Sequence, residues 1–167
     1  MPLSDFAKQE ILKSVTGNAG AFSSNVYLGL SSSEPFVGDS VNITEPIMQD
    51  GENKTSYARV RIGNNGVGSH SALNLFEYHA ASTDASGNPV PACMKNHTEI
   101  YFPESTTSWN FTAKYFVLFR SATGTRADDV IAWGKLNTDV TVDSSNLVVM
   151  FRPGELTVQL IENVAST

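Results

Sequence analysis

The spacing of apolar residues changes once along this 167-residue chain, from a helical period to a period of two. Near the N-terminus, one stripe of a helix would collect Phe6, Ala7, Ile11, Leu12 and Val15. Ser4 is a suitable N-cap for such a helix and Gly17 a suitable stop. The pattern therefore predicts an α-helix over Leu3–Val15, inside an N-terminal segment spanning residues 1–17.

After this segment the apolar positions alternate, as in half-buried strands. In NVYLGLS (25–31), Val26, Leu28 and Leu30 share one side. In SYARVRIG (56–63), the alternation predicts two faces. One would hold Ala58, Val60 and Ile62, and the other Tyr57, Arg59 and Arg61.

The strand pattern is densest after residue 98. Apolar segments at 99–102, 113–119, 129–136, 147–151 and 155–161 are separated by turn-forming stretches at 103–109, 120–128, 137–146 and 152–154. Strands at this spacing without intervening helices favour antiparallel pairing in a sandwich or barrel. The segments 115–119 and 147–151 are apolar on both faces, which suits strands covered on both sides or buried by an oligomer partner.

These patterns predict an all-β fold, an antiparallel, jelly-roll-like β-sandwich with one N-terminal α-helix. The length fits a single domain over residues 1–167. Residues 63–98, rich in Gly, Asn and Ser, would form an irregular insertion. Within it, 72–80 permits a short helical or strand piece, and 83–91 is a clear turn region.

Composition narrows the classes of partner. The net charge is −6 and no Lys/Arg cluster is present apart from the pair Arg59 and Arg61, so a nucleic-acid partner is not expected. No apolar run approaches a membrane span, and the N-terminal residues lack a signal-peptide core. The single cysteine, Cys93, excludes an intrachain disulfide. We therefore expect a soluble protein made in the cytoplasm.

The stretch FPESTTSW (102–109) raises the question of catalysis, because it combines Glu104, four hydroxyls and Trp109. A glycosidase needs two facing carboxylates. The other acids available are Glu45, Asp50, Glu99, Asp128 and Asp129, and nothing in their spacing pairs any of them with Glu104. We favour a structural corner in which Pro103 ends a strand, the hydroxyls satisfy the turn and Trp109 packs beside the sheet.

Cofactor and metal motifs are not evident. Cys93 and His97 lie four residues apart but supply too few zinc ligands, and His70 and His79 are isolated. The segment 84–88 lacks the carboxylates of a calcium loop, so an Asx-type turn is expected. No nucleophile, Walker or dinucleotide motif occurs. Asn-x-Ser/Thr triplets at Asn42, Asn53, Asn96 and Asn110 are interpreted as chance. We predict no catalytic residue, no cofactor and no metal.

Several motifs in order resemble a family of small bacteriophage virion proteins, described as tail-fibre or minor structural proteins. The motifs are SDFAKQEILKSVTG, YLGLSSSEP, YARVRI, IYFPESTTSW, YFVLFRSATG, VIAWGKL and FRPGELTVQL. Together they cover about two-thirds of the chain. Departures are Ser56 where a Gly is usual, a longer segment 124–129, and the longer stretch 63–98.

The resemblance implies a non-enzymatic β-sandwich that assembles on a phage particle, commonly as a homotrimer, beside other virion proteins. It does not separate a tail-fibre protein from a capsid decoration or head-fibre protein. The alternative is a carbohydrate-binding module that recognises a host-surface glycan. Contacts with glycan or partner would then come from Trp109, Tyr78, Arg59 and Arg61, whereas Trp133 is expected to pack.

Overall fold

The structure is a computed structural model, and it describes residues 25–46, 56–64, 75–90 and 93–159. The predicted N-terminal helix lies outside these residues. The described chain is built from β-strands, with one short 3-10 helix, η2 (Ala127–Asp129). The all-β prediction is confirmed.

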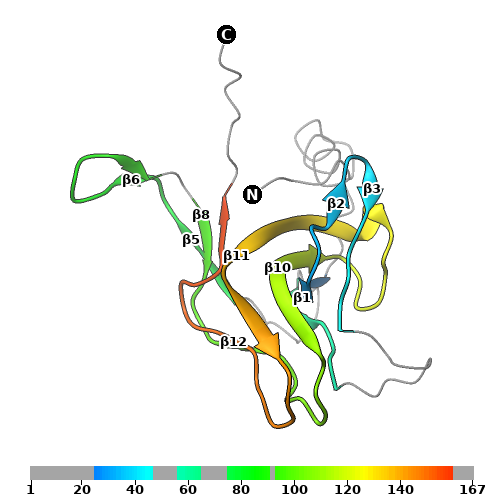
Figure 1. Cartoon of the computed structure of the whole chain (residues 1–167). Helices are drawn as coiled ribbons and strands as arrows, with labels where there is room; N and C mark the ends of the chain where they lie inside the picture. The colour runs from blue at the N-terminus through cyan, green and yellow to red at the C-terminus, as the bar shows by residue number, and fades with distance from the viewer. Residues whose placement is uncertain (1–24, 47–55, 65–74, 91–92, 160–167) are drawn as a thin grey trace.

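The largest unit is a four-stranded antiparallel sheet. Its strand order is β11 (Val130–Val142), β10 (Phe111–Phe119), β1 (Asn25–Ser31) and β4 (Val60–Asn64). Figure 1 shows β10 and β11 curving together across the molecule. A break in register between Val26 and Tyr27 alters the pairing of β1 with β4.

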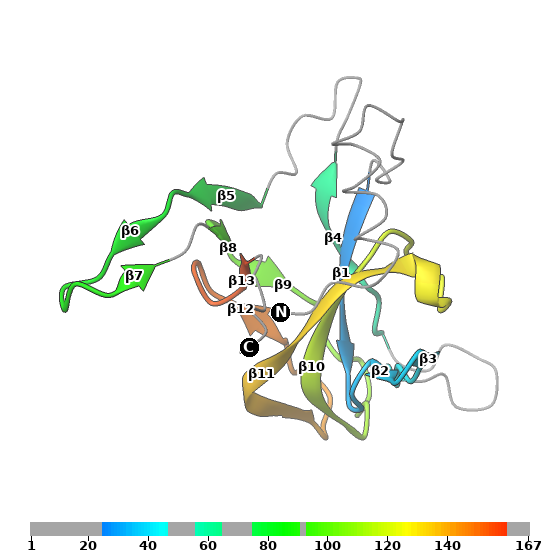
Figure 2. The ribbon, with the colours of Figure 1, turned by 90° about the horizontal axis from the view of Figure 1, so that it is seen from above.

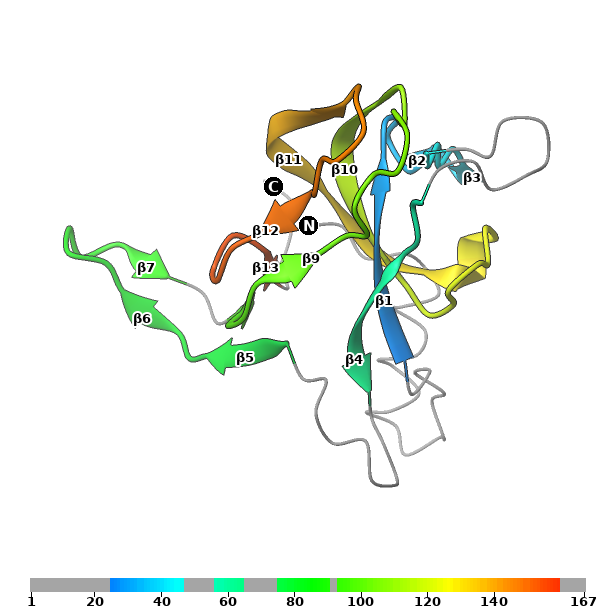
Figure 3. The ribbon, with the colours of Figure 1, turned by 90° about the horizontal axis from the view of Figure 1, so that it is seen from below.

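Shorter strands form four further units. They are β9 (Ile100–Tyr101) with β12 (Met150–Phe151); the order β13 (Thr157–Gln159), β8 (Cys93–Asn96), β5 (Phe76–His79); the hairpin β2 (Phe36–Val37) with β3 (Ser40–Val41); and the hairpin β6 (Ser82–Thr83) with β7 (Pro89–Val90). Figures 2 and 3 show β6 and β7 reaching away from the rest of the molecule.

The main hydrophobic core lies on one face of the large sheet. Leu28, Leu30 and Ile62 of that sheet join Ile100 and Phe151 of the β9–β12 pair in one buried cluster. The opposite face carries a second, smaller cluster of Val117, Phe119 and Val130, with Phe36 and Ile43 packed against it. The sheet is therefore apolar on both faces.

Strand β10 explains how one segment serves both clusters. Phe116 and Leu118 enter the main core, while Val117 and Phe119 enter the second cluster. The prediction that residues 115–119 are apolar on both faces is confirmed. The segment 147–151, which was also predicted to be covered on both faces, is covered on one face only, because Val149 is buried while Val148 is exposed.

Two expectations are corrected by the strand boundaries. Strand β11 continues to Val142, through residues predicted as a separator, because Val140, Thr141 and Val142 pair with the start of β10. The segment 63–98 was expected to be irregular, yet its described part contains β5 to β8, and the 72–80 piece contains strand β5.

Candidate functional site

The described part of the chain contains an ion pair between the buried side chain of Arg59 and the half-buried side chain of Glu45. The Arg59 Nε atom lies 3.0 and 3.1 Å from the two Glu45 carboxylate oxygens, and a terminal nitrogen lies 2.5 Å from Oε2. The Arg59 side chain is only 3% exposed. Its guanidinium carbon sits 3.3 Å from the ring centroid of Phe119, a cation–π contact.

Tyr57 completes this group, which we call the Glu45 cluster (Glu45, Tyr57, Arg59). Its hydroxyl donates to Glu45 at 2.6 Å and accepts from the Leu30 backbone N–H at 2.9 Å. Burial, followed by the negative charge of Glu45, raises the pKa of Tyr57 well above its ordinary value. The neutral phenol is therefore held as a donor to the carboxylate.

Gly29 provides the room for the Glu45 cluster on strand β1. A Cβ at this position would lie 2.7 Å from Phe119, 2.8 Å from Glu45 and 3.2 Å from the Tyr57 hydroxyl. The glycine between Leu28 and Leu30 is thus required by close approach on the face opposite the main core. In YLGLS, any larger residue would displace the cluster.

The same cluster holds a distant loop. A second Arg59 nitrogen donates to the carbonyls of Ser121 at 2.9 Å and Gly124 at 2.8 Å. These carbonyls follow strand β10, so one guanidinium connects the residues before β4, the loop after β10 and the loop containing Glu45. All three of its nitrogens donate to internal partners, and the geometry is that of a structural clamp.

The FPESTTSW stretch forms a hydrogen-bonded corner. Ser105 is fully buried; its hydroxyl donates to the Ser144 carbonyl and accepts from the Leu147 N–H. Across the corner, Ser56 donates to the Glu104 carbonyl and accepts from the Thr106 N–H. The prediction that the hydroxyls of the stretch satisfy its own turn is confirmed only for Ser108, which accepts from the Asn110 N–H; Ser105 instead satisfies the backbone of the 144–147 loop, and Ser56 satisfies the turn from outside the stretch.

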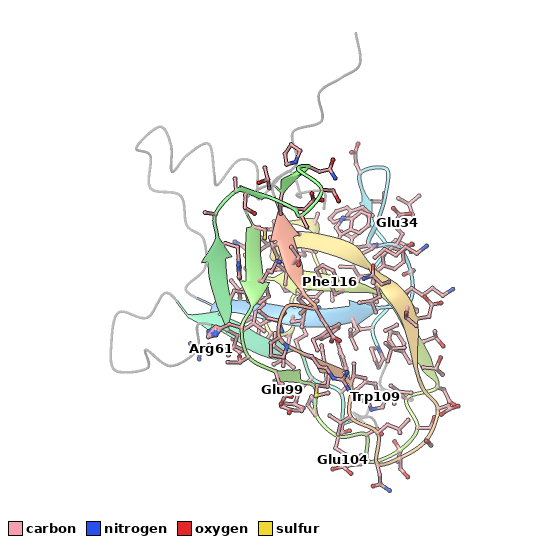
Figure 4. The ribbon with its side chains drawn as sticks, turned by 90° about the vertical axis from the view of Figure 1, so that its left-hand side faces the viewer. Glu34, Arg61, Glu99, Glu104, Trp109 and Phe116 are labelled. Carbon is pink, nitrogen blue, oxygen red and sulfur yellow. The ribbon has the colours of Figure 1, made fainter. Side chains whose placement is uncertain are left out.

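The two residues that suggested catalysis in this stretch lie in different environments. The Glu104 side chain is exposed, at the rim of the molecule in Figure 4. Trp109 is 5% exposed and packs edge-on against Tyr57, with ring centroids 5.4 Å apart. Its packing beside the sheet is confirmed, and so buried an indole offers no open face for a sugar.

The remaining predicted contact residues are placed separately. Arg61 is half-buried on β4 opposite Tyr27, and its buried Nε has no hydrogen-bond partner among the residues described. Tyr78 lies in β5 opposite Met94. Arg59 belongs to the Glu45 cluster, and Trp109 to the core. Trp133 packs edge-on against Tyr115, as predicted.

The acidic residues that the sequence offered as catalytic partners for Glu104 either bind other residues or lie outside the described part of the chain. Glu45 is engaged by Arg59 and Tyr57, and Asp50 lies outside the described residues. Asp128 and Asp129 both pair with Arg120 in the loop after β10. Glu99 is exposed and accepts a hydrogen bond from the Tyr101 hydroxyl.

Asn96 is a structural residue that the sequence did not reveal. Its amide nitrogen donates to the carbonyls of Arg152 and Thr98, and its Oδ1 accepts from the Leu156 N–H. The side chain is almost completely buried, so the triplet at Asn96 is not an accessible glycosylation site in this fold. A buried amide satisfied on both sides can be identified only from the tertiary structure.

Metal ligands do not converge in the described residues, where no group of three or more His, Cys, Asp or Glu side chains is found. Cys93 is buried and His97 exposed, and His70 lies outside the described residues. Segment 84–88 forms the predicted Asx-type turn, with Asp84 accepting from the backbone N–H groups of Ser86 and Asn88. Among the helices described, none has the length and apolarity to cross a bilayer.

Comparison with known proteins identifies the family. A search of curated proteins finds no match to this chain. The family model described as "Podophage GP4 fiber I protein gp80" matches residues 2–159. The match spans nearly the whole sequence and confirms the resemblance to bacteriophage virion proteins. The chain therefore belongs to the podophage GP4 fiber I protein gp80 family, a family of phage fibre proteins.

Proposed function

We propose that this chain is a non-enzymatic structural component of a bacteriophage particle, of the fibre type, that acts by assembling as a homotrimer with other virion proteins. The observation that carries the proposal is the fibre-family match over residues 2–159. Of the two virion positions compatible with the sequence, fibre and capsid decoration, the family description favours the fibre.

The arrangement of polar side chains supports a structural role. The buried or half-buried polar groups described above, in the Glu45 cluster and at Ser105 and Asn96, are directed at partners inside the chain. They join loops to strands within the part of the chain that the structure describes. Glu104, the acid first considered for catalysis, is exposed.

The arrangement of apolar side chains supports assembly. The core between the large sheet and the β9–β12 pair is consistent with the proposed sandwich-type packing. Outside that core, Tyr101 and Val148 remain 51% and 48% exposed. Tyr101 pairs with Met150, two residues after Val148 along the chain. Exposed apolar side chains gathered on one face mark surfaces that favour association.

The first experiment measures the solution mass by light scattering after size-exclusion chromatography. A homotrimer has three times the 18.0 kDa mass of one chain, about 54 kDa. A mass of 18 kDa that does not depend on concentration would contradict the proposed assembly. Immunogold labelling of particles then separates the positions: gold at the tail supports a fibre, and gold over the head surface supports a decoration protein.

Host-glycan recognition is a separate proposal for a fibre tip. The burial of Trp109 and Arg59 removes two of the four predicted contact residues and leaves Tyr78 and Arg61. A glycan array with the wild-type chain and Tyr78→Ala tests it. Binding that disappears in the variant supports recognition, and no binding on the array argues against it.

A further inference from the structure

A slender projection is formed by residues 80–90, which we call the arm. The paired strands β6 and β7 run along it, and among the strands described each is paired only with the other. Residues 80–89 are all exposed. Figures 2 and 3, taken from opposite sides, both show the arm leading away from the body of its own chain.

The tip of the arm is held by its own turn. The Asp84 carboxylate accepts from the backbone N–H groups of Ser86 and Asn88, each at 2.8 Å, and from the Asn88 side chain at 3.1 Å. Gly87 adopts a φ of +83°, which glycine tolerates best. The tip is therefore preorganised, which lowers the entropy cost of binding.

The composition of the arm is unusual for a projection surrounded by water. Its residues are small and uncharged except for Asp84, whose carboxylate is held by the turn. Exposed ribbons usually carry charged residues that discourage association. Ala80 and Ala81 are exposed and Val90 is half-buried, so the arm carries some apolar surface, and its short side chains allow a close approach of the backbone. An isolated two-stranded ribbon is also only marginally stable in water.

An apolar surface of matching character lies on the body of the chain. Tyr101 pairs with Met150 across β9 and β12, and Val148 lies two residues earlier, on the same side as Met150. We call these three residues the outer patch. Their neighbours Ile100, Val149 and Phe151 point the other way, into the main core. The outer patch is thus the solvent face of a pair whose inner face is buried.

We propose that the arm of one copy packs on the outer patch of a second copy of this chain. A second copy supplies the contact because the arm leads away from its own body. Arm and patch are different surfaces, so the contact is heterologous, and such contacts close into rings when the rotation permits. The inference rests on the proposed homotrimer and assigns its subunit contact.

Two matched pairs of substitutions test this contact by solution mass. Val148→Glu and Ala81→Glu place a charge in the patch and on the arm. Val37→Glu and Ala122→Glu place the same charge at exposed positions outside both, Val37 being 63% exposed. We expect the first two to lower the mass from about 54 kDa toward that of one 18.0 kDa chain, and the second two to leave it unchanged.

The outcomes separate this inference from the proposed function. If the wild type is a trimer and all four variants remain trimers, the arm–patch contact is wrong while the assembly stands. If the wild type is a monomer, both are wrong. Circular dichroism of each variant checks that the chain is folded, and a variant that does not fold is replaced by Ser at the same position.

Disulfide trapping tests the arm–patch contact independently, because it detects the contact in the intact assembly and does not depend on a variant that dissociates. In the double variant Ala81→Cys/Val148→Cys, oxidation should link neighbouring chains into species of two and three times 18.0 kDa on a non-reducing gel. Each single variant is the control, because it has no arm–patch partner. The native Cys93 is buried and contributes little background. A double variant that runs only as single chains would contradict the contact.

Discussion

At the scale of single residues, the Glu45 cluster has the strongest expected effect on stability. Replacing Glu45 with Gln leaves the buried Arg59 guanidinium without its counter-charge. Breaking a buried pair in this way costs about 3–5 kcal/mol of unfolding free energy. Urea denaturation should show a lower midpoint with an unchanged m-value.

The control for that substitution is Asp128→Asn, which removes a pair with Arg120 that is far more exposed. An exposed pair contributes less than about 1 kcal/mol. Equal losses in the two variants would show that the burial of Arg59 has no energetic importance.

The raised pKa of Tyr57 predicts that the free energy of unfolding falls at alkaline pH. Its pKa is raised in the folded chain, by burial first and Glu45 second, so the folded state keeps a proton that the unfolded state loses above pH of about 10. This contribution is fully present below pH 10 and is lost as the pH rises further. We expect Tyr57→Phe to flatten this alkaline fall in unfolding free energy.

The same variant should be less stable than the wild type at pH 7, because Glu45 and the Leu30 N–H lose the phenol. The expected loss is about 1–3 kcal/mol. Chemical denaturation of both proteins between pH 7 and 11 measures the two effects. Parallel curves for variant and wild type would refute the assigned role of the phenol.

At the scale of elements, Asn96 joins strand β8 to the turn between β12 and β13. Asn96→Ala leaves the Leu156 N–H and the carbonyls of Thr98 and Arg152 without this side chain. The expected cost is about 3 kcal/mol. Amide hydrogen exchange should accelerate most at Leu156, and Asn88→Ala in the exposed arm should leave that exchange rate unchanged.

Strand β1 requires a residue without a side chain at Gly29. Gly29→Ala puts a methyl group 2.7 Å from Phe119 and 2.8 Å from Glu45, so the Glu45 cluster must shift. Overpacking of this kind costs about 1–3 kcal/mol. Thermal unfolding at pH 7 measures the loss. If the Ala variant matches the wild type, the close packing described around β1 is wrong.

At the scale of the whole molecule, assembly should be coupled to stability. If folded chains are stabilised by association, the apparent melting temperature rises with protein concentration by mass action. We expect such a rise in the wild type and a weaker one in Val148→Glu, which charges the outer patch. A melting temperature independent of concentration in the wild type would indicate that the subunits fold and melt as monomers.

Much of the fold follows from local sequence. The alternation of Leu28 and Leu30 predicts β1, and the two-sided apolar run at 115–119 predicts a strand covered on both faces, as β10 is. The corner at 102–109 was also predictable, because hydroxyl-rich residues after a Pro are typical turn formers. These features depend on residues close in sequence, whose patterning directly encodes which side is buried.

For other positions the prediction from sequence was wrong or could not be made, because their structure depends on partners that are distant in sequence. Alternation placed Tyr57 opposite Ile62, yet both lie in the main core, since Tyr57 precedes the first residue of β4 and is not bound by that strand's alternation. The strand through Val140 to Val142 was missed because its pairing with Phe111 decides it.

The sequence by itself determined the all-β class, the positions of the principal strands and the similarity to phage virion proteins. The tertiary structure alone decided that Arg59 is a buried clamp and not a surface contact, that Trp109 is in the core, and that Asn96 joins strand β8 to the turn between β12 and β13. The physical reason is the separation along the sequence between a residue and its partners. Periodicity reports which face of a segment is apolar, but the partners of a buried charge or amide come from residues dozens of positions away.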